Sequence, residues 1–163
     1  MANYCEREDV VRWYGGTEDN VRMHFDSQLW STPLTSFTVV GLTFDIPTTI
    51  LLRIDEAIAD ASSELDTRIL QAYLALPTEV PRHLRKAAAK LAAFEAVADD
   101  GVLTERLKEG HKDVLAYFDR IAKKELDLGI VAPRPANRGP IVQVVQIGGT
   151  LGSRNGRYRG CGC

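Results

Sequence analysis

A single apolar stripe runs through residues 47–73 at helical spacing. Aliphatic side chains recur every three or four residues, at Ile50, Ile54, Ala57, Ile58, Ala61, Leu65 and Ile69. Side chains with this period share one face of an α-helix, so the segment predicts a long helix with one buried face. Pro47 suits its first turn because the missing N–H would have no helical partner there. Burying each large aliphatic contributes about 1.5–3 kcal/mol, so we expect this helix to organise the core.

Two further long helices are predicted from the same kind of pattern. Residues 81–99 open with a proline and precede Gly101, and residues 104–125 follow Thr104, a common capping residue type. Their stripes complete a core in which we expect the first helix to meet the other two, through Ile54, Ile58, Leu65, Leu91, Leu115 and Phe118.

Shorter elements are predicted on either side of these helices. Residues 5–14 form a short helix that Gly15 and Gly16 end, and Thr17 starts another short helical turn. Residues 25–46 are predicted to be an ordered loop with one extended stretch. The predicted fold is therefore mainly α: a small bundle of about three long helices with short N-terminal helices, followed by an extended C-terminal arm containing one β-strand.

Length and composition limit the class of protein. A chain of 163 residues favours one compact domain. Its net charge of −2 gives no general attraction to nucleic acid or to a membrane surface. No apolar run approaches the roughly 20 residues of a membrane helix, and residues 1–9 are too polar for a secretory signal. We therefore expect no membrane association and synthesis in a cytoplasm.

The chain changes character near residue 132. Residues 132–163 contain five arginines and no acidic residue, a charge of +5, and the other 15 basic and all 22 acidic residues give residues 1–131 a charge of −7. Seven of the 13 glycines also lie after this point. We therefore divide the chain into a helical domain, residues 1–131, and a basic glycine-rich arm, residues 132–163.

Within the arm, residues 141–147 predict a β-strand because β-branched side chains dominate them. Apolar side chains occupy both faces, Val142 and Val144 on one and Ile141, Val145 and Ile147 on the other. Ordering about thirty residues costs tens of kcal/mol, more than these side chains recover. Either a partner protein adds this strand to a sheet, or the arm folds back on its own domain. Carboxylates of the partner, or DNA phosphate, are the targets expected for Arg154, Arg157 and Arg159.

No catalytic motif stands out in the sequence. There is no phosphate-binding loop, no nucleophile elbow and no metalloprotease motif, and the three histidines lie far apart. Cys161 and Cys163 supply two thiolates, which cannot complete a tetrahedral zinc site, so they and Cys5 are predicted to be reduced thiols. The sequence therefore predicts no enzyme, no cofactor and no metal site.

Two rows of like charge give a more specific indication of a binding surface. Glu56, Asp60 and Glu64 are four residues apart on the first long helix, and Arg82, Lys86 and Lys90 repeat this spacing on the second. Like charges at this spacing repel slightly within a helix. Either both rows are solvated, or each faces the other sign within one subunit or between neighbours. A ring of identical subunits would use such unlike patches, because its interfaces join two different surfaces.

Several short stretches together resemble a known family. They are YCEREDV at residues 4–10, IDEAIADASSELD at residues 54–66, YLALP at residues 73–77 and LDLG at residues 126–129. In this order they resemble small proteins of Mu-like bacteriophages that are related to the head–tail connectors of siphophages. The resemblance covers residues 4–130, whereas the arm and the long segment 25–46 depart from it.

This resemblance implies a structural role. It implies a helical adaptor that forms a ring of about twelve copies beneath the portal at the capsid vertex. The expected partners are further copies of itself, the portal protein and a tail-side stopper or tail terminator protein, with transient contact to the genomic DNA passing through. The expected place is the neck of the virion, after assembly in the host bacterial cytoplasm. The rival reading is a small helical nucleic-acid-binding regulator that uses residues 77–90 on phosphates. An enzyme with an unrecognised site is a third.

Overall fold

The computed structural model describes residues 3–73, 75–98 and 101–130, and every structural statement below concerns these residues. Its helices and strands, in chain order, are α1 (Arg7–Tyr14), α2 (Glu18–Arg22), a 3-10 helix η1 (Ser27–Ser31), β1 (Leu34–Val39), β2 (Leu42–Pro47), α3 (Thr48–Ala72), α4 (Arg82–Ala98) and α5 (Glu105–Ala122). The mainly α class and the short N-terminal helices are confirmed. The predicted arm strand lies outside the described residues.

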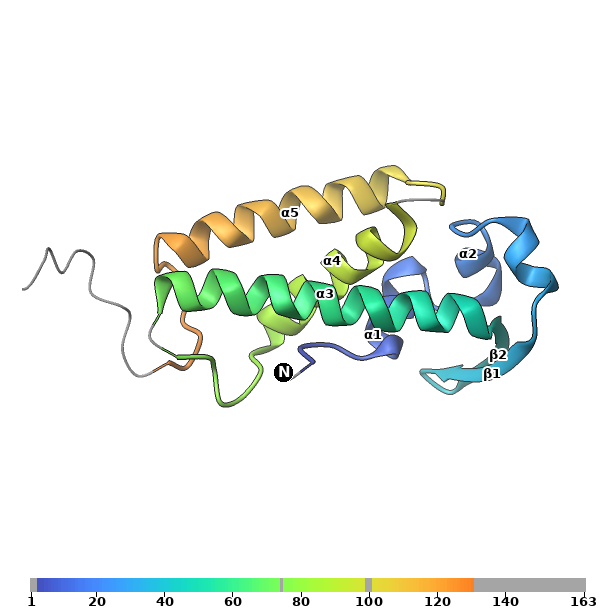
Figure 1. Cartoon of the computed structure of the whole chain (residues 1–163), viewed down its shortest axis with the longest axis horizontal. Coiled ribbons are helices and arrows are strands. Elements are labelled where there is room, and N and C mark those ends of the chain that lie inside the picture. Colours follow the sequence, from blue (N-terminus) through green and yellow to red (C-terminus); the bar gives the residue numbers. More distant parts are fainter. Residues whose placement is uncertain (1–2, 74, 99–100, 131–163) are drawn as a thin grey trace, which may run out of the picture.

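Three long helices form the body of the molecule. Helices α3 and α5 lie alongside each other, and α4 packs against both of them (Figure 1). Helix α3 begins directly after Pro47 and ends at Ala72, where Tyr73 adopts an extended backbone conformation. Thr104 stands at the N-cap position of α5, as predicted, but its side chain makes no capping hydrogen bond. The three predicted stripes therefore correspond to the three helices that enclose the core.

The prediction that Leu115 belongs to the core is wrong. Ile54, Ile58, Leu65, Leu91 and Phe118 are buried in a single cluster, but Leu115 is 48% exposed. Each residue of an α-helix turns the side chain by about 100°, and the core-facing direction of α5 is taken by Val114. Leu115 lies one step beyond it and therefore points toward solvent.

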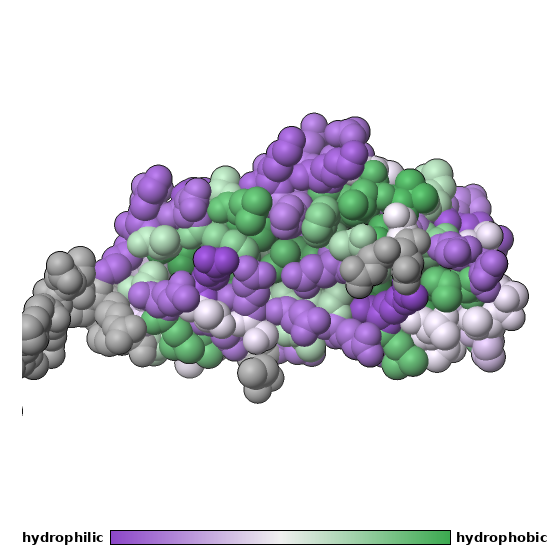
Figure 2. All heavy atoms as spheres, turned by 45° about the horizontal axis from the view of Figure 1, so that its top comes forward, coloured by the Kyte–Doolittle hydropathy of each residue, from purple (hydrophilic) through white to green (hydrophobic). Residues whose placement is uncertain are grey.

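Further apolar side chains remain on the surface. The exposed ones are Met23, Leu34, Val40, Leu42, Leu52, Leu70, Leu76, Val102 and Leu115. Figure 2 shows hydrophobic atoms in a band along the molecule's long axis, interrupted and bordered by hydrophilic side chains. Among the described helices, none is both long enough and apolar enough to cross a membrane.

The N-terminal segment closes one side of the bundle. Helix α1 buries Val10, Val11 and Tyr14 against the long helices, and the Tyr14 hydroxyl donates a hydrogen bond to the Ala93 carbonyl at 2.9 Å. Just before α1, the Tyr4 backbone N–H donates to the buried Ser62 hydroxyl at 3.3 Å. Residues 4–14 therefore depend on contacts with α3 and α4, which come much later in the chain.

The loop predicted for residues 25–46 is wrong in part. The structure places η1 there, followed by an antiparallel hairpin of β1 and β2 in which Phe37 faces Phe44 and Val39 faces Leu42. Extended backbone was predicted only at residues 37–40, a stretch that overlaps the last three residues of β1. Residues 42–46 alternate apolar and polar side chains, which is the pattern of a half-buried strand, and the sequence analysis overlooked it.

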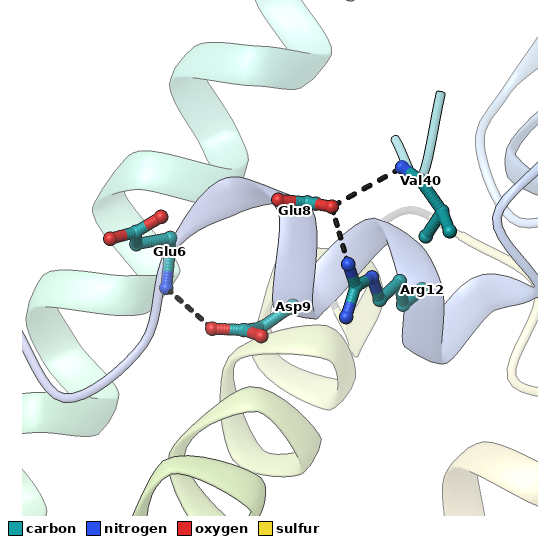
Figure 3. A network of polar contacts seen from close by, with 5 residues as sticks. All are labelled: Glu6, Glu8, Asp9, Arg12 and Val40. Carbon is teal, nitrogen blue, oxygen red and sulfur yellow. Dashed lines mark hydrogen bonds and ion pairs between the residues drawn. The ribbon is translucent and has the colours of Figure 1, made fainter. Parts of the chain in front are cut away.

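The hairpin turns at Val40 and Gly41, both with positive φ, at 50° and 80°. Positive φ at both central residues defines a type I′ turn, which favours Asn-Gly and strains a β-branched residue. The Glu8 carboxylate accepts the Val40 N–H at 3.3 Å and the Arg12 guanidinium at 2.6 Å, which holds the turn against α1 (Figure 3). Both contacts lower the pKa of Glu8 below its ordinary range.

Replacing Val40 by Asn is therefore expected to stabilise the protein. Asparagine tolerates the left-handed conformation, so the free energy of unfolding should rise by about 1 kcal/mol. Because Val40 is 71% exposed, no core packing is lost. Denaturant unfolding of Val40→Asn checks this, with Leu42→Asn as a control at a neighbouring exposed position that lacks positive φ. A lower stability for Val40→Asn than for the unchanged protein would show that the turn is not strained.

Candidate functional site

The predicted basic row forms part of a groove between α1 and α4. Arg82 and Lys86 are exposed and Lys90 is half-buried. The groove has a volume of about 730 Å³ and is lined by Asp9, Arg12, Trp13, Val80, Arg82, Arg85, Lys86, Ala89 and Lys90. We call it the basic groove, because five of these residues are cationic and Asp9 is the one carboxylate.

Trp13 forms the aromatic wall of the basic groove. The Lys90 Nζ atom lies 5.0 Å from the centre of the Trp13 ring, and the Arg106 guanidinium carbon lies 4.9 Å from it. Cations over an indole face are attracted by its negative potential. Lys90 also pairs with Asp113 of α5 at 2.5 Å. Lys90 is therefore held in place by α1 and α5, whereas Arg82 and Lys86 are exposed.

Two of the five cationic residues of the basic groove were missed by the sequence analysis. Arg85 lies three residues from Arg82, on the same side of α4, and a search for four-residue spacing passes over it. Arg12 comes from α1, and only the tertiary packing of α1 on α4 brings it near the predicted row.

The predicted acidic row lies beside another carboxylate. Glu56 and Asp60 are exposed, and Glu64 pairs with Arg68 of its own helix at 3.1 Å. Burial, with the charges of Glu64 and Asp60, raises the pKa of Glu95 on α4 from 4.5 to about 7. The Glu95 Oε2 atom is buried without a hydrogen-bond partner. We call Asp60, Glu64 and Glu95 the acidic face. Among the described residues, no cation forms an ion pair with Glu95.

Glu95 is expected to make stability depend on pH. A carboxyl whose pKa is raised on folding favours the protonated form, so its contribution to stability is present at low pH. That contribution is lost as the pH rises from about 4.5 through about 7. Glu95→Gln should therefore raise the free energy of unfolding at pH 8 by about 1 kcal/mol, a value reduced for partial exposure, and change it little at pH 5. Denaturant unfolding at both pH values checks this, with the exposed Glu109→Gln as control. A loss of stability at pH 8 in Glu95→Gln would contradict it.

The two predicted rows do not pair with each other within one chain. Among the described residues, the ion pairs of these rows join Glu64 to Arg68 and Lys90 to Asp113. Glu95, the residue of α4 that lies near the acidic row, stands close to the end of this helix. The basic row begins in the first turn of the same helix, at Arg82. Pairing between neighbouring subunits stays a prediction.

The other predicted site residues lie outside the described part of the chain. They are the arm residues Ile141, Val142, Val144, Val145, Ile147, Arg154, Arg157 and Arg159. Within the described ranges, no group of three or more histidine, cysteine or acidic side chains is arranged to hold a metal ion.

Comparison with known proteins gives one match. Residues 4–145 match the model of the family described as "Bacteriophage Mu, Gp36". A search of curated proteins finds no match. A search of solved structures finds none either. The family match extends past the expected limit at residue 130 and includes the first part of the predicted arm strand. Because it covers most of the chain, the protein belongs to the bacteriophage Mu Gp36 family and is a phage structural or assembly-related protein.

Proposed function

We propose that this protein is a structural head–tail adaptor of a Mu-like phage rather than an enzyme. In this proposal, copies of the chain form a ring beneath the portal in the neck of the virion. The ring links the capsid to a tail-side stopper or tail terminator protein and lets the genomic DNA pass. The observation that carries the proposal is the family match over residues 4–145.

The charge distribution supports a ring of identical subunits. A closed ring with head-to-tail contacts needs two different surfaces on each subunit. The basic groove and the acidic face are two such surfaces, carried by different parts of the bundle. A cationic neighbour would also relieve the repulsion around Glu95. Exposed ion pairs contribute only about 0–1 kcal/mol each, so these contacts would set orientation more than strength.

Charge reversal tests this interface. Lys86→Glu places a carboxylate in the basic groove and should weaken retention on portal-containing heads, measured by co-sedimentation. Asp60→Lys should weaken it in the same way, because it places a cation on the acidic face. The double variant should recover most of the loss, since the two charges have exchanged sides.

The control is Lys112→Glu, which makes the same change in net charge at an exposed position on α5 outside the basic groove. Equal retention of Lys86→Glu and Lys112→Glu would remove the groove from the interface. Images of the purified neck test the wider proposal: adaptor density beneath the portal supports it, and its absence from heads that hold a portal rejects it.

The basic groove also favours a second candidate, a protein that binds nucleic acid. Five cations beside the Trp13 ring resemble the combination of phosphate contacts and aromatic stacking used on nucleic acids. This reading predicts an affinity for duplex DNA that falls steeply with salt and is weakened by Arg82→Gln or Arg85→Gln. A salt titration of binding separates the two candidates, because the adaptor must let DNA slide without gripping it.

A further inference from the structure

The hairpin leaves one edge of β1 unpaired. Strands β1 and β2 form a two-stranded sheet, and no other described strand joins it. In a two-residue hairpin, the pair that flanks the turn exchanges backbone hydrogen bonds, and the next pair points its N–H and C=O groups outward. Val39 and Leu42 flank this turn, so Thr38 and Thr43 are the outward pair. The same alternation places Pro47, which has no N–H, at an outward position.

A groove runs along this edge of β1. Its volume is about 620 Å³, and it is lined by Asn3, Cys5, Glu6, Arg7, Glu8, Phe37, Thr38, Asp55 and Ile58. Phe37 and Thr38 are consecutive, so their side chains lie on opposite faces of the sheet, and a groove that touches both follows the strand edge. Arg7 is paired with Asp55 and Glu8 with Arg12, so Glu6 is the carboxylate of the groove that has no ion pair among the described residues. We call this the edge groove.

The turn beside the edge groove carries exposed apolar side chains. Val40 and Leu42 are 71% and 58% exposed. Val40 also has the positive φ that disfavours β-branched residues, and the Glu8 carboxylate binds its N–H (Figure 3). Strain that is kept at an exposed position is a common property of interaction sites.

We propose that residues 141–147 of a neighbouring copy add to β1 as a third strand, lying in the edge groove. The strand that the sequence predicts there is about as long as β1 and would carry apolar side chains on both faces, so it would need cover on both. Strand addition would satisfy its backbone groups and those of the β1 edge together. The arm carries +5 without an acidic residue, which complements the exposed carboxylate of Glu6. The family match also includes residues 141–145.

The choice of a neighbouring copy rests on the proposed ring. The last described residues lie at the end of the bundle where α3 finishes, and the hairpin lies toward the opposite end, where α3 begins (Figure 1). The edge groove borders Asp55 and Ile58, which lie about 21–26 Å along the helix axis from the end of α3 at Ala72. Residues 131–140 reach about 33–36 Å when fully extended, so the chain's own arm is long enough to reach this groove as well. In the proposed ring each copy also lies beside a neighbour, and exchange of arms would link the subunits. For this adjacency the inference rests on the proposed function.

Cross-linking between two populations tests the proposal. One population carries Ser36→Cys on β1 and the other carries Val144→Cys in the arm, both with Cys161→Ser and Cys163→Ser. Cys5 is left in place, because burial raises its pKa to about 12 and it offers little reactive thiolate. The mixed populations, free and bound to portal-containing heads, are treated with a short bismaleimide. We expect cross-linked dimers from the mixture, and a ladder of oligomers from a chain that carries both cysteines.

Matched proline variants show whether the β1 edge is used. Thr38→Pro removes an outward N–H from β1, and Thr43→Pro removes its counterpart from β2, at a position equally exposed. Cross-linking should fall about tenfold with Thr38→Pro and stay nearly unchanged with Thr43→Pro. Gln143→Pro with Gln146→Pro, placed in the arm, should give the same loss without touching the hairpin.

Each other outcome is decisive. A compact cross-linked monomer as the only product shows that the arm folds onto its own domain and overturns the proposal. Equal losses from Thr38→Pro and Thr43→Pro, or no product at all, overturn it too. Sedimentation of the same samples keeps the proposed function separate. Adaptor that stays on heads without cross-linking refutes only this strand addition, and cross-linking in free protein that never binds heads refutes only the adaptor role.

Discussion

Leu65→Ala is expected to lower the free energy of unfolding by about 2–5 kcal/mol, the usual cost of removing a buried leucine side chain. Leu65 lies on α3 and is fully buried in the cluster that joins α3 to α4 and α5. Its removal leaves a cavity among helices that cannot all close around it. Denaturant unfolding followed by circular dichroism measures the change.

Leu115→Ala is the matched control for this prediction. It removes the same atoms from α5, but Leu115 is 48% exposed, so its cost should stay within about 0.5 kcal/mol. Equal losses in the two variants would show that Leu115 is buried in solution, for example against a neighbouring copy, and that the single chain does not describe its environment.

Removing the arm is expected to weaken retention on portal-containing heads without unfolding the protein. A chain ending at residue 131 keeps the whole described core, so its helical spectrum and unfolding transition should be nearly unchanged. Its retention on portal-containing heads should fall at least about tenfold, a loss of about 1.4 kcal/mol or more. Co-sedimentation of truncated and full-length protein with these heads is the measurement.

A second variant separates the arm's charge from its strand. Replacing Arg154, Arg157 and Arg159 by Gln keeps residues 141–147 and removes three cations. We expect an intermediate loss of retention, because backbone pairing survives while the charge-assisted contacts do not. If the truncated chain is retained as well as the full-length protein, the arm is dispensable for docking.

The sequence predicted the long helices because each has a strong local signal. Helix α3 repeats apolar side chains over seven turns, and Pro47 and Pro77 limit its extent. Such periodic patterns survive any tertiary arrangement, because every arrangement must bury the same face. The prediction failed for Leu115 because this residue lies at the edge of an apolar stripe, where one residue along the helix separates a buried position from an exposed one.

The hairpin and the candidate surfaces were harder to predict for a different reason. Residues 34–47 carry serine, threonine and aspartate among their apolar residues, and the turn is Val-Gly rather than the Asn-Gly that signals a hairpin. The four-residue spacing predicted the row of Arg82, Lys86 and Lys90. Arg12 is far from this row in the sequence, and only the tertiary packing of α1 brings it into the same groove. Glu95 follows Phe94 within the apolar part of α4, and only its proximity to Asp60 and Glu64 makes it unusual. A pattern along the chain reports neighbours within an element and is silent on those from another.

The hydrogen bond from Tyr14 to Ala93 joins residues 79 positions apart. Helix α1 is translated before α3 and α4, yet it packs against both of them. During synthesis, the side chains of Val10, Val11 and Tyr14 therefore stay exposed until α3 and α4 have been made. The packing of α1 therefore has to await the synthesis of α4, and until then its apolar face is a surface on which the nascent chain can aggregate.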